Sequence, residues 1–183
     1  MFKKIAALVL CGAVLCGLAG CEFGRKEKEI DPKRSPHDYA VQVRQNIQKY
    51  LKKGDAEAIS AMFSEYYATS PQEVQGLLNF IDGKIVSFDK SSIQSNGHSV
   101  EYGVYSEYGY GGQFNISTNS GKEYECHFAG YAVYDEEPEQ VGLGRLSIIN
   151  VVDEKDRYGV GACYNEKGQE LDLNGNVIER YLK

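Results

Sequence analysis

The segment KEYECHFAGYAVY, residues 122–134, decides the fold because its side chains alternate between apolar and polar with a period of two. One face would carry Tyr124, Cys126, Phe128 and Ala132, and the other Glu123, Glu125 and His127. Such alternation is typical of a β-strand that is buried on one face only. We therefore expect the apolar face of this strand to pack against the core of an antiparallel sheet.

The chain on both sides of this segment, from residue 84 onward, also has strand character. Strands are predicted over residues 84–88, 99–108, 113–118, 122–134, 143–152 and 158–164, followed by a terminal hairpin of 169–173 with 176–182. Glycine-rich turns are predicted at residues 96–97, 109–112, 119–121 and 174–175. The run LSIINVV, residues 146–152, is apolar on both faces, which predicts a central strand covered on each side.

The chain before residue 84 has a helical period instead. A first helix is predicted over residues 38–53, and Gly54 ends it. Asp55 is placed to cap a short second helix, while Ser70 and Glu73 form a capping box that begins a third. The buried faces of these helices are predicted to hold Val43, Ile47, Tyr50 and Leu51, then Ile59, Met62 and Phe63, then Val74, Leu77, Leu78 and Ile81. The order of elements predicts an α+β fold, with N-terminal helices packed on a curved antiparallel sheet.

The first 20 residues have the composition of a secretory signal peptide. Lys3 and Lys4 precede an apolar run over residues 5–18, which is shorter than the ~20 residues that a membrane-spanning helix needs. The motif Leu18-Ala19-Gly20-Cys21 resembles the lipobox of bacterial lipoproteins. This resemblance implies cleavage before Cys21 and lipidation of its thiol, and two acyl chains suffice for stable anchoring. We expect a lipid-anchored protein on the extracytoplasmic face of the cell membrane; an uncleaved hydrophobic anchor is the alternative.

Three parts of the chain follow from this interpretation. Residues 1–20 are the signal peptide, residues 21–36 form a disordered tether that is rich in charge, and residues 37–183 form one domain. Flexible-chain scaling gives the tether a reach of about 20 Å. Cleavage removes two of the 20 basic residues and no acidic one, so 18 basic and 26 acidic residues remain, a formal charge of −8. Nucleic acid is therefore not an expected partner.

Two cysteines remain beyond the lipidation site, and we expect them to stay unpaired. The strand periods place Cys126 with the core-facing residues and Cys163 on the same face as Gly159 and Gly161. Side chains that point to different faces do not meet the geometry of a disulfide. A scaffold that depends on disulfides is excluded by the same low count.

Three helices followed by a long curved sheet resemble the nuclear transport factor 2-like, or cystatin-like, superfamily, which implies a cone-shaped fold. Three stretches also resemble an uncharacterised family of lipidated envelope proteins from Gram-positive bacteria. They are GDAEA with MFS (54–58, 62–64), IDGKIVSF (81–88), and PEQVGL with LSII (138–143, 146–149). The resemblance covers about residues 38–153, implies a fold and a location, and carries over no catalytic residue. The cone that it implies should be mostly filled by bulky side chains.

The sequence offers little for catalysis or metal binding. His37, His98 and His127 lack the spacing of metal ligands, so neither a metal nor another cofactor is predicted. His127 and Glu125 share a strand face and would suit acid–base work, although a solvated strand face is the simpler interpretation.

The sequence contains fourteen tyrosines and no tryptophan, a composition that suits recognition by aromatic side chains. Half-buried strands favour tyrosine, but an aromatic surface or pocket lip would also suit a glycan, a peptide or a partner protein. The candidate ligand-binding residues are Tyr102, Tyr124, Tyr134 and Asn150. Asn150 is the one polar residue on its face of the run 146–152, and a buried amide needs a partner. We predict that Asn150 is structural, with a role at the floor of a pocket as the alternative.

The leading hypothesis is a non-catalytic envelope lipoprotein, attached to the lipid bilayer through acylated Cys21, that binds a small ligand or an envelope protein. A small cavity enzyme that uses Tyr124, Tyr134 and Asn150 is one alternative. The other is an anchored immunity protein against a secreted toxin, which the acidic charge and the apolar run 146–152 favour weakly.

Overall fold

The structure, a computed structural model, describes residues 30–165, 167–169 and 171. Among these residues, three α-helices precede an antiparallel sheet with the strand order β1-β2-β3-β4-β5. The elements are α1 (Pro36–Lys53), α2 (Ala56–Ser60), α3 (Pro71–Phe80), β1 (Ile85–Glu101), β2 (Val104–Thr118), β3 (Glu123–Tyr134), the 3₁₀ helix η1 (Pro138–Gln140), β4 (Gly142–Asn150) and β5 (Arg157–Gly161). The predicted α+β class is confirmed.

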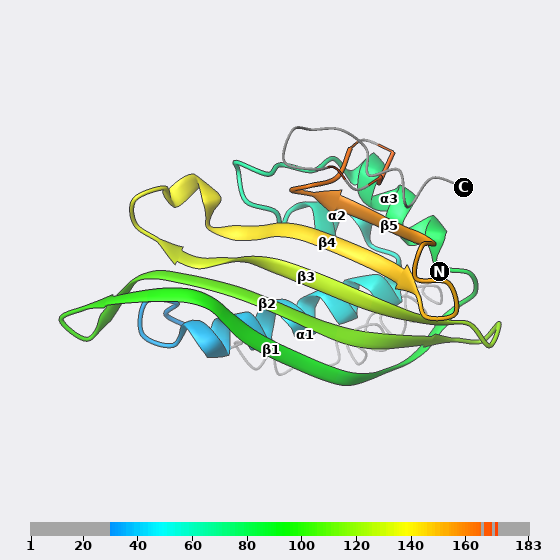
Figure 1. Ribbon diagram of the computed structural model, residues 1–183, viewed down its shortest axis with the longest axis horizontal. Helices are drawn as coiled ribbons and strands as arrows, with labels where there is room; N and C mark the ends of the chain where they lie inside the picture. The colour runs from blue at the N-terminus through cyan, green and yellow to red at the C-terminus, as the bar shows by residue number, and fades with distance from the viewer. Residues whose placement is uncertain (1–29, 166, 170, 172–183) are drawn as a thin grey trace, which may run out of the picture.

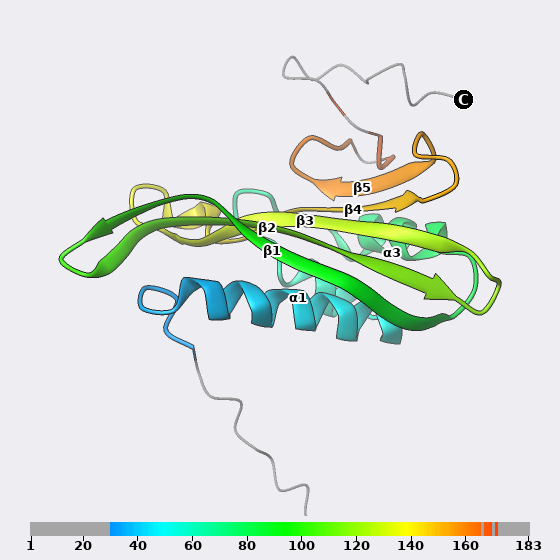
Figure 2. The ribbon, with the colours of Figure 1, turned by 60° about the horizontal axis from the view of Figure 1, so that its bottom comes forward.

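The helices and the sheet form two layers. Helix α1 packs against β1, β2 and β3, whereas α3 packs against β4 and β5. Figure 1 looks at the sheet with the helices behind it, and Figure 2 shows α1 running along the underside of the twisted sheet. No helix in the described part of the chain covers the other face of the sheet. None of the helices in that part is long and apolar enough to cross a bilayer.

Local chemistry sets the helix ends, as the sequence predicts. Gly54 adopts a left-handed conformation (φ 68°), and its N–H donates to the Leu51 carbonyl at the end of α1. The Asp55 carboxylate accepts from the Ala58 N–H at 3.0 Å. The Ser70 N–H donates to the Glu73 carboxylate at 2.8 Å, which completes the predicted capping box of α3. Helix α2 is shorter than expected.

The core lies between the helices and the sheet. Val43, Ile47 and Leu51 of α1 are buried, and so are Val74 and Leu77 of α3. They meet the buried face of the sheet, which is made by Phe114, Ile116, Tyr124, Cys126, Phe128, Leu146 and Ile148. The predicted inner face of β3 is thus confirmed, including Ala132. Met62 and Phe63 lie beyond the end of α2, half-buried at the edge of this core.

The first two strands correct the prediction of turns at residues 96–97 and 109–112. Both segments lie inside strands, and Gly97 pairs with Gly109 at a bulge. The chain reverses instead at Tyr102 and Gly103, whose φ angles are 51° and 78°. The predicted strands 84–88, 99–108 and 113–118 therefore merge into two long strands, β1 and β2.

The glycines of β2 allow close approach rather than a turn. A Cβ atom on Gly112 would lie 2.5 Å from the Phe128 ring and 2.6 Å from the Ser92 carbonyl. A side chain on Gly111 would meet the Asn96 amide at 2.7 Å. At Gly112 the neighbouring strands bring a ring and a backbone oxygen so close that only glycine fits, whereas at Gly111 the exposed Asn96 side chain could move aside.

The apolar run 146–152 also differs from its prediction as a central strand covered on each side. β4 ends at Asn150, and β3 is the middle strand of the sheet. Val151 and Val152 lie in the following turn, where Val152 is 92% exposed. The run 146–152 has the composition of a single strand because most of its residues are apolar. The turn after Asn150, however, places Val151 and Val152 outside the sheet.

The end of the chain shows two further differences. β5 stops at Gly161 instead of residue 164, so Cys163 lies beyond the strand in a left-handed conformation (φ 68°). Both thiols are free, with Cys126 buried and Cys163 exposed, which confirms that they do not pair. The reason is the position of Cys163 outside the strand rather than strand parity. The signal peptide, most of the tether and most of the predicted terminal hairpin lie outside the described residues.

Candidate functional site

The four predicted ligand-binding residues do not form one site. Tyr124 and Asn150 face each other across β3 and β4. Tyr102 lies at the tip of the β1–β2 hairpin, and Tyr134 ends β3. Figure 1 places the end of β4, where Asn150 lies, and the β1–β2 tip at opposite ends of the sheet.

Tyr124 and Asn150 make structural contacts. The Tyr124 hydroxyl accepts from the Asp82 N–H at 2.9 Å and so holds the segment between α3 and β1. The Asn150 amide donates to the Asp156 carboxylate at 3.1 Å, and its oxygen accepts from the Val152 N–H at 3.0 Å. The two Asn150 bonds close the turn between β4 and β5. The Tyr124 hydroxyl and the Asn150 amide thus already have hydrogen-bond partners within the protein.

Tyr134 and His127 also lie outside any described cavity. The Tyr134 ring stacks on Tyr131 with a centroid distance of 4.8 Å, and the Glu137 carboxylate raises the pKa of the Tyr134 phenol. His127 Nε2 lies 3.2 Å from Glu125 Oε2, and both side chains are partly exposed. Their partial exposure is typical of a solvated strand face, although the Nε2 atom of His127 itself is buried. The described residues contain no cluster of acidic, histidine or cysteine side chains that would hold a metal ion.

A cleft of about 280 Å³ opens between α1, the segment after α2 and the start of β4. Its lining is mostly apolar and aromatic, with two amides. It comprises Tyr39, Gln42, Val43, Asn46, Ala61, Met62, Phe63, Tyr110, Val141 and Gly142. We call these residues the α1–β4 cleft. Its volume is close to the lower end of the ~300–1,000 Å³ of ligand pockets.

Backbone pairing builds the floor of the α1–β4 cleft. The Ser64 N–H donates to the Leu143 carbonyl and the Leu143 N–H to the Met62 carbonyl, both at 2.9 Å. This pairing lays residues 62–64 beside the start of β4. Gly142 is required there, since its φ is 130° and a Cβ atom would lie 2.9 Å from the Ser64 nitrogen.

The aromatic wall of the cleft is neutral. Tyr110 is fully buried, and its hydroxyl donates to the Gly142 carbonyl at 3.2 Å. Tyr39 packs edge-on against it with a centroid distance of 6.4 Å. Burial raises the pKa of both phenols, most strongly that of Tyr110. Both therefore stay protonated at neutral pH. Tyr110 serves in packing and hydrogen bonding, and Tyr39 in packing.

Among the residues that the structure describes, no charged one lines the α1–β4 cleft. The amides of Gln42 and Asn46, four residues apart on α1, supply donors and acceptors beside the apolar side chains of Val43 and Phe63. Such a lining is able to hold an uncharged group through apolar contact and a few hydrogen bonds.

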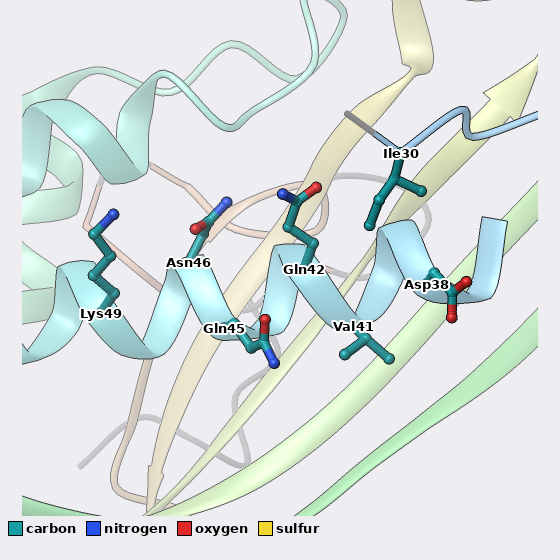
Figure 3. A pocket seen from close by; sticks show the side chains of 7 residues that line it. All are labelled: Ile30, Asp38, Val41, Gln42, Gln45, Asn46 and Lys49. Atoms are coloured by element: carbon teal, nitrogen blue, oxygen red, sulfur yellow. The ribbon is translucent and has the colours of Figure 1, made fainter. Parts of the chain in front are cut away.

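The cleft continues onto the outer surface of α1. A shallower hollow of about 370 Å³ is lined by Ile30, Asp38, Val41, Gln42, Gln45, Asn46 and Lys49. Figure 3 shows the Ile30 side chain reaching toward α1 between Gln42 and Asp38. Gln42 and Asn46 line both hollows, so the two share a border.

Sequence reasoning missed the α1–β4 cleft. Only one signal points to it, the two amides spaced by four residues next to the buried stripe of α1, and this pattern is also typical of a solvated helix face. The contact of residues 62–64 with β4 has no local signature.

Comparison with known proteins identifies the family of the chain. The family model described as "Domain of unknown function (DUF5104)" matches residues 46–154, from the middle of α1 to just beyond β4. No curated protein matches the chain in sequence. The matched span includes the inner strands of the sheet and most of the α1–β4 cleft. Since it covers more than half of the chain, the protein belongs to the DUF5104 family.

Proposed function

We propose that this protein is a membrane-anchored envelope lipoprotein whose domain binds a small ligand or a partner and does not catalyse a reaction. The anchor is supported by the sequence alone, through Leu18-Ala19-Gly20-Cys21 and the apolar run before it. Cys21 would carry the lipid on the extracytoplasmic face of the cell membrane.

The fold we propose is the nuclear transport factor 2-like cone. Its support is the position of the three helices on one face of a twisted five-stranded sheet, with a hollow between helix α1 and the sheet. Bulky side chains fill most of the space between the layers, so the α1–β4 cleft is a shallow remainder at one edge.

The neutral lining of the α1–β4 cleft carries the proposal of binding. General acid–base catalysis needs a group whose pKa lies near the working pH. Among the described residues, the polar side chains that line the cleft are two amides and two phenols, and the pKa values of the phenols are raised. Of the three residues of the enzyme alternative, Tyr124 and Asn150 already hold backbone turns, and Tyr134 stacks on Tyr131 outside the cleft. A small uncharged molecule, or one uncharged side chain of a partner, suits the cleft best.

Ala61 offers a test because it is exposed yet lines the α1–β4 cleft. Ala61→Phe should fill the cleft without disturbing the core, and Ala68→Phe places the same ring on an exposed loop outside it. We would measure the binding of small uncharged fragments to the full lipidated chain in nanodiscs by ligand-observed NMR. Fragments that bind the wild type should bind Ala68→Phe equally and Ala61→Phe at least about tenfold more weakly, a difference of about 1.4 kcal/mol. If no fragment distinguishes the two variants, the α1–β4 cleft is not a binding site.

A further inference from the structure

The tip of the β1–β2 hairpin presents apolar side chains to solvent. Tyr102 is fully exposed, and Val100 and Val104 on either side of it are 51% and 38% exposed. Figure 1 shows the hairpin extending past the ends of β3 and β4, so the tip stands clear of the rest of the sheet. We call Val100, Tyr102 and Val104 the hairpin tip.

The turn itself does not explain the tyrosine. Tyr102 and Gly103 form a two-residue loop in which both φ angles are positive, and Glu101 pairs with Val104 across it. Asn, Asp and Gly adopt this conformation with the least strain, whereas a bulky aromatic residue rarely does. A strained residue with no packing partner among the described residues points to a role outside the domain.

The chain that leads to the predicted anchor passes beside this hairpin. The Tyr105 N–H donates to the Lys33 carbonyl at 3.1 Å, and Lys33 Nζ lies 2.7 Å from Asp135 Oδ1 at the end of β3. Tyr102 lies three residues before Tyr105 in the sequence, which is about 10 Å along the strand toward the hairpin tip. The twelve residues from Cys21 to Lys33 span at most about 40 Å when extended. The hairpin tip is therefore within reach of any bilayer that holds Cys21.

We propose that the hairpin tip inserts into the interface of the lipid bilayer to which the chain is anchored. This inference rests on the proposed lipidation of Cys21. Tyrosine suits the headgroup region because its ring is apolar and its hydroxyl is polar, and the two valines add apolar area beside it. A second contact next to the anchor would orient the domain on the membrane.

The charges near the hairpin tip set the depth of insertion. Glu101 is next to Tyr102, and the exposed acids Asp135, Glu136 and Glu137 follow β3. Carboxylates prefer water, so the contact should be shallow and should weaken as the membrane becomes more anionic. Zwitterionic vesicles are therefore the appropriate probe.

The absence of tryptophan from the whole sequence gives a direct assay. Tyr102→Trp places a single tryptophan at the hairpin tip, and Val104→Trp places a second reporter there if the first variant fails to fold. Val152→Trp is the control for Tyr102→Trp, because Val152 is also almost fully exposed but follows β4 at the opposite end of the sheet. Each full-length lipidated variant would be reconstituted in phosphatidylcholine vesicles, with and without brominated acyl chains, and its emission recorded.

At the hairpin tip, the emission should shift to shorter wavelength, and brominated lipid should quench it several-fold more than at Val152→Trp. If the protein floats with the vesicles while both positions are quenched equally, the hairpin tip does not insert and only this inference is overturned. The same holds if Tyr102→Trp is shielded from aqueous iodide but not quenched by brominated lipid, because a protein surface then covers it. If the wild type does not float with the vesicles, the anchor itself is wrong and both proposals are overturned.

Discussion

Replacing Asn150 by alanine tests whether this residue serves the fold or a ligand. Two hydrogen bonds would be lost, from its amide to Asp156 and from the Val152 N–H to its oxygen, at 3.1 and 3.0 Å. A net hydrogen bond contributes about 0.5–1.5 kcal/mol, and one to a charged group about 1.5–3 kcal/mol. Because Asn150 is only half-buried and water replaces part of the loss, we expect Asn150→Ala to cost about 2 kcal/mol.

Thermal unfolding of the full chain without added ligand measures this cost. For a domain of this size, a loss of 2 kcal/mol lowers Tm by about 4–8 °C. Asn79→Ala is a suitable control, because this exposed amide on α3 accepts a hydrogen bond from Gln75 of its own helix and, among the described residues, ties no other segment to α3. Its effect should stay within about 0.5 kcal/mol.

A swapped pair separates the hydrogen bond from the loss of side-chain volume. Asn150→Asp alone places two carboxylates together and should destabilise the turn. Adding Asp156→Asn restores a donor and an acceptor in reversed positions, so the double variant should recover most of the stability. An Asn150→Ala melt that matches the wild type would refute the structural role and revive the interpretation of Asn150 as a ligand contact.

Three further predictions concern the anchor, the thiols and the packing of α3. Cys21→Ala should leave an unprocessed precursor of higher mass on gels and in mass spectra; a processed variant that stays on membranes contradicts the lipobox. Without reductant, alkylation should label the exposed Cys163 in the native protein and Cys126 only after unfolding. Cys126 is buried, and burial raises the pKa of the Cys126 thiol well above the usual value. Fewer than two labels on the unfolded chain would contradict free thiols. Gly76→Ala would gain about 1 kcal/mol in an open helix, but its Cβ atom would lie 2.3 Å from the Tyr158 hydroxyl, so we expect a net loss of about 1–2 kcal/mol in denaturant unfolding. Tyr158→Phe should reduce that loss, and a more stable Gly76→Ala protein would show that the packing is different.

Features decided within a few residues could be predicted from the sequence. The helix ends at Gly54, Asp55 and Ser70 follow from bonds between groups at most three or four residues apart, so the local sequence contains all their partners. The inner face of β3 follows from strand periodicity, and the order of helices and strands then gives the α+β class. The signal peptide and the lipidation of Cys21 also rest on local sequence, and they remain predictions.

Features decided by residues far apart in the sequence required the tertiary structure. Glycine is compatible with a turn and equally with a crowded strand. Only the pairing of Gly111 and Gly112 with both neighbouring strands, and the Phe128 ring against Gly112, shows that β2 continues where a turn was expected. The reversal at Tyr102 could not be predicted either, because tyrosine favours strands and rarely occupies such a turn.

The α1–β4 cleft depends on the same kind of distant contact. Its floor exists because residues 62–64 pair with the start of β4, about eighty residues later, and because Gly142 leaves room for them. The sequence therefore determined the local elements and the buried face of β3, and it alone supports the predicted location of the protein at the membrane. The pairing of distant segments decided where the chain turns, which polar side chains have hydrogen-bond partners within the protein, and where a ligand has room. These features depend on contacts with residues far away in the sequence, which no local pattern specifies.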